Sequence, residues 1–271
     1  MRFSFVVSAG LGYRIPHLFE TNASFVEFRS ALRLLRQQGF SGVEINLATT
    51  EHQILSRISE VVHREQIHLA AIGTGLLYLT RGDSFTARNT IRRRRALSAV
   101  KKVIQFASGE NAVVIIGLIR GGTSVVVDSE PLSQALVECD GFASDEGARL
   151  ALEAINRYET FQLQTAAETA QVIHDEKLRS TGLLLDTFHM NIEEQSIEET
   201  IRRWHRMLSH FHIADSNRLA PGRGHLRIER FLRILDEIQY GGYVSAEILP
   251  RPNNRRAVID TAAFLRRNDF I

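Results

Sequence analysis

The stretch TGLLLDTFHMNIEEQSIEETIRRWHRMLSHFHIADSNRLAPGRGHL, residues 181–226, contains two short apolar runs that each end at a polar side chain. The first run ends at Asp186 and the second at His212. Two further apolar runs follow the same pattern and end at Glu153 and at Glu247. Short apolar runs of this length are typical of buried strands. Four predicted strands in series therefore each end at a side chain that can bind a metal ion.

The remainder of the chain supplies the other half of a regular β/α alternation. Four earlier strands are predicted at 2–8, 42–45, 67–72 and 112–116, with helical periodicity between them. Eight units of roughly 34 residues each are the size expected for a (β/α)8 TIM barrel. No linker, low-complexity segment or change of composition interrupts residues 1–271, which predicts a single domain. A doubly wound open sheet is the competing architecture, but no G-x-G-x-x-G follows the first strand.

The composition excludes several classes of protein. The chain is 44% hydrophobic and 24% charged with a formal net charge of +2, so no global charge favours nucleic acid or an anionic membrane. The single cysteine, Cys139, excludes an intrachain disulfide, and we expect a reducing, cytoplasmic setting. No apolar run approaches the ~18 residues of a membrane span, so no membrane partner is expected.

In a (β/α)8 barrel the active site lies at the carboxyl ends of the strands, here called the mouth. Neighbouring strands five to eight would place Glu153, Asp186, His212 and Glu247 around one side of this mouth. Three carboxylates and one imidazole suit one divalent cation, which could be Mn²⁺, Mg²⁺, Co²⁺ or Zn²⁺. Taken singly, each residue could instead cap a helix or join an ion pair. Together, three carboxylates that converge without a cation would repel one another.

Three more polar residues are expected in the loops at the same mouth. His189 follows Asp186 by three residues, Glu159 follows Glu153 by six, and Arg218 follows His212 by six. Imidazole and guanidinium groups can bind hydroxyl or carbonyl oxygens, and a carboxylate can bind hydroxyls. Glu159, His189 and Arg218 are thus candidate substrate-binding residues, although each taken singly is more often a hydrogen-bonding loop residue.

The roles of three further residues stay open at this level. Pro221 to His225 is predicted to form a turn, from which Arg223 and His225 could face the mouth, and Arg223 could select the substrate. Glu44 ends the second predicted strand, where it could orient a ligand or have a buried structural role.

Four segments near these residues resemble the ketose 3-epimerases of the xylose-isomerase-like barrel superfamily, a group that includes the D-tagatose and D-psicose 3-epimerases. The segments are NRYET (156–160), LDTFHMNIEE (185–194), HFHIADSNR (210–218) and AE (246–247). AIGTG (71–75) and VIIGL (114–118) look most similar to the branch that acts on keto-sugar acids, such as the 5-keto-L-gluconate epimerases. The resemblance covers nearly the whole chain. One departure is Ala154, where the family usually has a proline.

The resemblance implies a metal-dependent epimerase that inverts C3 of a ketose or keto-sugar acid through a cis-enediolate. The family's metal ligands fall on Glu153, Asp186, His212 and Glu247, and its acid/base pair on Glu153 and Glu247. Its substrate-binding residues fall on the three loop residues named above. We expect Mn²⁺ as the cation, with Mg²⁺, Co²⁺ and Zn²⁺ as alternatives, and a dimer or tetramer as in relatives.

Other activities occur on the same fold. Aldose–ketose isomerases, including hydroxypyruvate isomerase, and inosose dehydratase would need a similar site, and a non-catalytic sugar-binding protein would not need two convergent glutamates. An abasic-site endonuclease would need extra metal ligands on strands two to four, but strands three and four run into Gly73 and Gly117. The basic run 92–95 lacks interleaved aromatic residues, which favours a solvated helix face over a nucleic-acid site. The particular sugar, metal and oligomer cannot be read from the sequence.

Overall fold

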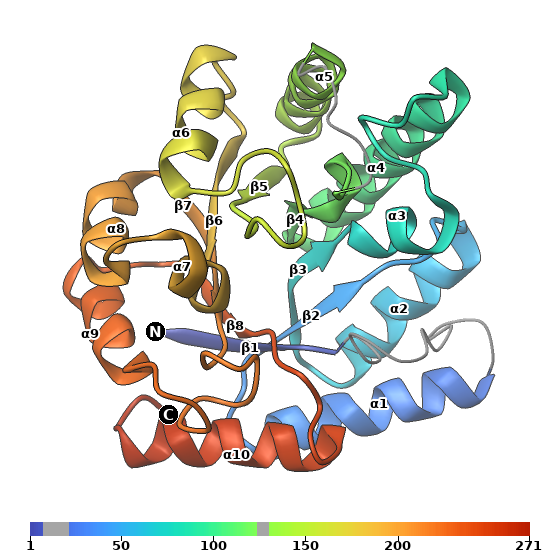
Figure 1. The fold of residues 1–271 in the computed structure, drawn as a ribbon. Helices are drawn as coiled ribbons and strands as arrows, with labels where there is room; N and C mark the ends of the chain where they lie inside the picture. The colour runs from blue at the N-terminus through green and yellow to red at the C-terminus, as the bar shows by residue number, and fades with distance from the viewer. Residues whose placement is uncertain (8–21, 124–129) are drawn as a thin grey trace.

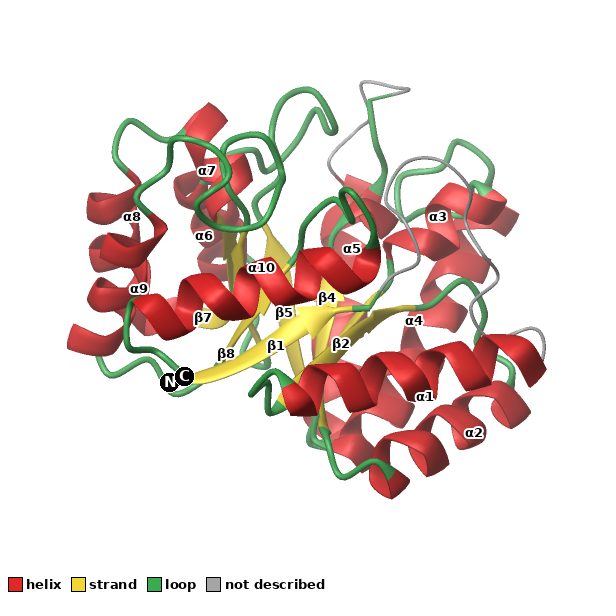
Figure 2. Ribbon diagram, turned by 90° about the horizontal axis from the view of Figure 1, so that it is seen from below, coloured by secondary structure: helices red, strands yellow, loops and turns green. Residues whose placement is uncertain are grey.

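Eight parallel strands close into a barrel with the helices outside it (Figure 1; Figure 2). The structure is a computed structural model that describes residues 1–7, 22–123 and 130–271. Its strands are β1 (Arg2–Val6), β2 (Gly42–Asn46), β3 (His68–Gly73), β4 (Val113–Ile116), β5 (Arg149–Glu153), β6 (Thr181–Asp186), β7 (Leu208–Ile213) and β8 (Tyr243–Ala246). They pair in chain order, and β8 closes the ring on β1 with Phe3 opposite Val244. The predicted (β/α)8 barrel is confirmed, and an open sheet is excluded.

The helices follow the strands in the alternation that the sequence predicts. They are α1 (Asn22–Gln37), α2 (His52–Arg64), α3 (Gly75–Arg81), α4 (Thr90–Glu110), α5 (Glu130–Glu146), α6 (Ala166–Asp175), α7 (Thr187–Glu193), α8 (Ile197–Trp204), α9 (Ile228–Glu237) and α10 (Asn254–Arg267), with short 3-10 turns η1 (Leu118–Arg120) and η2 (His205–Met207). Local capping fixes several of the starts. At the start of α6 the hydroxyl of Thr165 accepts from the backbone N–H of Glu168, and the Glu168 carboxylate accepts from the backbone N–H of Thr165. At the start of α8 the hydroxyl of Ser196 accepts from the backbone N–H of Glu199.

The strand ends agree closely with the prediction. β5 ends at Glu153 and β6 at Asp186, while His212 is one residue before the end of β7 and Glu247 directly follows β8. The first strand is shorter than predicted because it ends at Val6, and residue 8 of the predicted strand lies outside the described residues. Among the described residues, no helix combines the length and the apolar character that a membrane span requires.

The inside of the barrel is divided into an apolar half and a polar half. Side chains alternate between the two faces of a strand, so every second residue points inward. One small buried cluster lies on the inward positions of β3 to β6 and consists of Ala71, Val113, Ile115, Ala151 and Leu184. The inward positions of β1, β2, β7 and β8 include five polar, almost fully buried residues, which are Ser4, Glu44, His210, His212 and Ser245. The candidate site adjoins this polar half.

Candidate active site

The four predicted metal ligands converge at the mouth. Each of Glu153, Asp186, His212 and Glu247 offers one ligand atom, and these atoms all lie within 4.8 Å of one another. His212 Nδ1 is 3.0 Å from Glu247 Oε2, 3.6 Å from Asp186 Oδ2 and 3.9 Å from Glu153 Oε1. The first three residues are buried and Glu247 is partly buried. The arrangement therefore gathers one nitrogen and three carboxylate oxygens around a common point.

Asp186 combines a capping role with its place in the cluster. Its Oδ1 accepts a hydrogen bond of 2.7 Å from the backbone N–H of Phe188 and so caps α7. Its Oδ2 points instead toward Arg218 and His212. The sequence left open whether Asp186 caps a helix or belongs to the cluster. Its Oδ1 caps α7, and its Oδ2 is directed into the cluster.

The hydrogen bonds of His212 determine which of its nitrogens can bind a cation. Its Nε2 is 3.2 Å from the carboxylate of Glu44, which can only accept a hydrogen bond, so the proton lies on Nε2. Nδ1 is buried without any hydrogen-bond partner in the described part of the chain. Burial opposes a charge on this ring, but Glu44 and Glu247 outweigh it and raise the pKa of His212 well above its usual value, so without a cation Nδ1 carries a proton directed toward the three carboxylates. A divalent cation at this point would take the place of that proton. A histidine oriented by a carboxylate on its far nitrogen is typical of metal sites, so this donor set fits a divalent cation.

A buried chain of hydrogen bonds, which the sequence did not predict, continues from Glu44 through His210 of β7 and Ser245 of β8 to Ser4 of β1. Glu44 also accepts from Nε2 of His210 at 2.8 Å, and the same nitrogen lies 3.0 Å from Ser245 Oγ. Ser245 Oγ is in turn 2.5 Å from Ser4 Oγ. Burial disfavours a charged Glu44, but His212 and His210 outweigh it and hold the pKa of Glu44 well below its usual range. Glu44 therefore stays ionised and orients both imidazoles.

The two glutamates of the cluster differ in their electrostatic environment. Burial, reinforced by the charge of Glu247, raises the pKa of Glu153. Burial also acts on Glu247, but Arg218 and His212 outweigh it and lower its pKa. The protein without a cation thus holds one glutamate that favours the protonated form and one that favours the ionised form. Such divergence is typical of acid/base pairs.

The loop after β5 positions Glu159 and His189 beside the cluster. The amide nitrogen of Asn156 is 2.6 Å from Nδ1 of His189 and 3.0 Å from Oε1 of Glu159. Because an amide nitrogen donates, His189 accepts at Nδ1 and carries its proton on Nε2, which lies 3.6 Å from Glu153 Oε1. Burial lowers the pKa of His189 to about 4, so the ring is neutral. Asn156 belongs to the NRYET segment, and its role in holding both residues appears only in the structure.

Arg218 lies inside the carboxylate cluster. Its guanidinium donates to Asp186 Oδ2 and to Glu247 Oε2, both at 2.5 Å, and it stacks 4.9 Å from the ring centre of Phe188. The residue has a left-handed backbone with φ of 61°. The structure thus brings all three candidate substrate-binding residues to the cluster.

Arg223 and His225 do not join the site, so the expectation that Arg223 could select the substrate is wrong. Arg223 is exposed and pairs with Asp260 of α10 at 2.6 Å. His225 is also exposed, and its Nδ1 lies 2.9 Å from Ser216 Oγ. The predicted turn is present because Asp215 accepts hydrogen bonds from backbone N–H groups at both ends of the loop, including that of Gly222 at 2.8 Å. This folding directs Arg223 outward.

Neighbouring residues leave room for the Glu153 carboxylate and support the Glu153 backbone. A Cβ at Gly117 would lie 2.6 Å from Glu153 Oε2, so a side chain there would collide with the carboxylate. The buried Arg120 donates to the carbonyl of Glu153 at 2.5 Å. Ala154, which replaces the expected proline, donates its N–H to Leu184 O at 3.3 Å, a bond that proline could not make. The loop therefore regains some of the rigidity that the proline would supply.

Comparisons with known proteins place this chain in one family. A 106-residue match is 42% identical to D-psicose 3-epimerase of Agrobacterium fabrum (strain C58 / ATCC 33970) and spans 39% of this chain and 37% of that relative. A longer match to 3-dehydro-D-guloside 4-epimerase of Escherichia coli (strain K12) is 26% identical over 86% of this chain and 92% of the relative. The crystal structure of D-psicose 3-epimerase with D-tagatose from Clostridium cellulolyticum H10 superposes with a TM-score of 0.80 at 20% identity, over 100% of this chain and 99% of that one. Residues 32–268 match the model of one family, and the chain therefore belongs to the xylose isomerase-like TIM barrel family.

Proposed function

We propose that this protein is a metal-dependent sugar epimerase that inverts the carbon next to a ketone, C3 of a ketose or keto-sugar acid. The observation that carries the proposal is the placement of two glutamates, Glu153 and Glu247, at one buried cluster around His212 Nδ1. Inversion needs one group to remove a proton and another to return a proton on the opposite face. The names of the two relatives, a ketose 3-epimerase and a 3-dehydro-glycoside 4-epimerase, both denote inversion at a carbon beside a ketone.

Glu153, Asp186, His212 and Glu247 would hold the cation, for which we propose Mn²⁺, with Mg²⁺, Co²⁺ and Zn²⁺ as alternatives. A divalent cation at this position supplies Lewis-acid polarisation of the ketone, which makes the neighbouring C–H more acidic. The unpaired, buried Nδ1 of His212 supports this assignment, because its other nitrogen is already bound to Glu44.

The chain's own residues would perform the proton transfers. One glutamate of the pair takes the proton from C3, and a cis-enediolate results. The other glutamate returns a proton on the opposite face, and the two exchange roles when the reaction runs in reverse. His189 presents its Nε2–H beside Glu153, where it can donate to a substrate oxygen, and Glu159 can accept from a hydroxyl. Arg218 supplies further donors to the substrate oxygens and orients Asp186 and Glu247.

The test uses Glu153→Gln and Glu247→Gln, each assayed for bound metal and for solvent deuterium exchange at the inverted carbon. Each variant should lose epimerisation by at least a hundredfold, in line with the removal of a general acid or base. Glu193→Gln is a matched control, since Glu193 pairs with Arg157 at the rim of the mouth and lies outside the cluster. Exchange at the wild-type rate in either site variant, with metal retained, would refute the assignment.

The substrate panel should contain free ketoses, keto-acids and phosphorylated ketoses, supplied with Mn²⁺. Product analysis by NMR separates epimerisation from the aldose–ketose isomerisation that remains the alternative. A product with its carbonyl moved to C1 would replace the epimerase proposal by an isomerase on the same site.

A further inference from the structure

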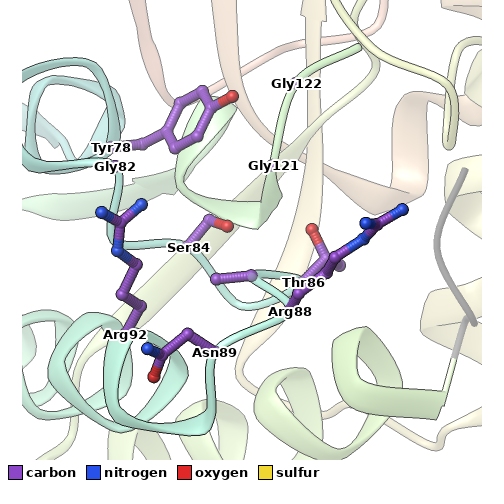
Figure 3. Close-up of a pocket in the computed structure, with 10 residues that line it drawn as sticks. Tyr78, Gly82, Ser84, Thr86, Arg88, Asn89, Arg92, Gly121 and Gly122 are labelled. Carbon is purple, nitrogen blue, oxygen red and sulfur yellow. The ribbon is translucent and has the colours of Figure 1, made fainter. Parts of the chain in front are cut away.

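A second cavity lies on the mouth side of the barrel, between the loop that follows α3 and the glycines that follow η1 (Figure 3). Its volume is about 430 Å³. Both of its walls belong to connections that leave the carboxyl ends of β3 and β4, so it opens on the same side as the glutamate cluster. A Cβ at Gly122 would lie 3.1 Å from Tyr78 Oη and 3.4 Å from the carbonyl of Glu159. The loop that carries Glu159 therefore borders this cavity.

The lining of the cavity is cationic. Arg88 and Arg92 contribute to it, and none of the residues that line it is an aspartate or a glutamate. Within residues 1–7, 22–123 and 130–271, neither guanidinium has an acidic partner, whereas neighbouring Arg95 pairs with Asp83 at 2.9 Å. The guanidinium of Arg92 lies against Gly82, where a Cβ would be 2.9 Å from Nη1. Among the described residues, two positive charges thus border the cavity without a compensating carboxylate.

A buried hydroxyl completes the lining. Ser84 is 3% exposed, and its side chain has no hydrogen-bond partner among the residues that the structure describes. In Figure 3 the Ser84 side chain lies below Tyr78, between Arg92 and Gly121, with its hydroxyl on the side of Gly121. Nearby Thr86 differs, because its hydroxyl donates to Arg120 O at 2.6 Å. Ser84 is therefore a buried polar group that a ligand in the cavity can satisfy.

We infer that this cavity binds an oxyanion, a carboxylate or a phosphate. The planar guanidinium of Arg92 suits two oxygens of such a group, and the Ser84 hydroxyl supplies another donor. The cavity also lies at the amino end of the 21-residue helix α4, whose dipole favours a negative charge. The oxyanion comes either from the end of the substrate remote from the reacting carbons or from free phosphate. The first source rests on the proposed function, and the second does not.

The binding test measures inorganic phosphate and gluconate by isothermal titration calorimetry on the full chain. Arg92→Gln should weaken binding about tenfold to a hundredfold and Ser84→Ala by a smaller factor, as expected for lost hydrogen bonds to a charged group. Arg94→Gln is the matched control, because Arg94 is exposed on the same helix outside the cavity, and it should change the affinity less than twofold. Equal losses in Arg92→Gln and Arg94→Gln would overturn the inference, because binding would then depend only on net charge.

The kinetic test identifies the source of the oxyanion. If the substrate carries it, kcat/KM for a 6-phosphate or uronate ketose should exceed that for the matching neutral ketose, and Arg92→Gln should reduce that ratio at least tenfold. If Arg92→Gln leaves this kcat/KM ratio unchanged and the protein binds inorganic phosphate, the cavity binds free phosphate. Turnover of neutral ketoses with neither anion binding nor an anion preference overturns this inference and leaves the proposed function intact. Anion binding by a protein that turns over no ketose overturns only the proposed function.

Discussion

Replacing Glu44 by glutamine should weaken metal binding although Glu44 is not itself a candidate ligand. Its carboxylate accepts hydrogen bonds from Nε2 of both His210 and His212. A glutamine has nearly the same shape, but its NH₂ group donates and cannot accept. Both bonds fall on Oε2, which the amide oxygen could replace, but His212 Nε2 also lies 3.2 Å from Oε1, where the NH₂ group would face its N–H. The ring of His212 would then hold its proton on Nδ1 instead. On His212 that proton would point toward Glu247 Oε2, 3.0 Å away, and would block the lone pair needed by the cation.

The expected size of this effect follows from the loss of one orienting partner. Removal of a residue that orients a metal ligand typically lowers metal affinity about 10- to 100-fold, or about 1.4 to 2.8 kcal/mol. Because Glu44 is only 1% exposed, the variant should also lose about 1 to 3 kcal/mol in the free energy of unfolding of the metal-free protein. The two effects are separable, because one is measured as a dissociation constant of folded protein.

Titration calorimetry with Mn²⁺ on the chelator-treated protein measures the dissociation constant, and urea unfolding measures stability. Glu65→Gln serves as the control, since Glu65 is also a buried carboxylate with two side-chain partners, Arg29 and Arg33, but lies far from the mouth. It should lose stability and keep its Mn²⁺ affinity. A Glu44→Gln protein that binds Mn²⁺ within threefold of the wild type would show that Glu44 does not orient His212.

Two other variants and one labelling experiment test further features. Gly117→Ala should lower epimerisation, measured by product NMR, because the new Cβ would displace the Glu153 carboxylate. Gly109→Ala has nothing within 4 Å of its new Cβ, so it should keep activity and gain about 0.5 to 1 kcal/mol of stability. Equal activity in the two variants would contradict the steric role of Gly117. Burial raises the pKa of Cys139 to about 12, so the folded thiol should resist a disulfide reagent at pH 8 and react on unfolding. Because that pKa exceeds the ~8.5 of an unfolded cysteine, the thiol's contribution to stability is complete below pH 8.5 and is lost as the pH rises toward 12. Native Cys139 that reacts as fast as free cysteine would contradict its burial.

The positions of the four cluster residues could be predicted because strand ends are local in sequence. An apolar run that stops at a polar residue marks the end of a parallel strand, and the barrel brings consecutive strand ends together. The same rule found Asp186 and His212, which lie opposite each other in the register of β6 and β7. No structural information beyond strand order was needed for these contacts.

Contacts across the barrel could not be predicted in this way. Glu44 lies on β2 and meets two histidines of β7, a strand that is not its neighbour in the sheet. His210 and His212 are two residues apart, so the alternation of a strand places them on one face, but it does not say which residue faces them. The direction of the Arg223 side chain could not be predicted for a related reason. Its partner Asp260 comes from α10, and the direction of an exposed arginine depends on charges that are distant in sequence.

The buried hydrogen-bond network of Ser4, Ser245, His210, Glu44 and His212 has a role beyond stability. Buried polar groups cost free energy even when they are satisfied, and apolar residues of similar volume often serve stability equally well. The apolar inward residues of β3 to β6 show that this chain can fill the same interior with hydrocarbon. The polar residues are found on β1, β2, β7 and β8, and their hydrogen bonds lead through His210 and Glu44 to Nε2 of His212. A network placed for stability alone would have no reason to end at His212, whose other nitrogen faces three carboxylates, so its position argues that orienting His212 is its purpose.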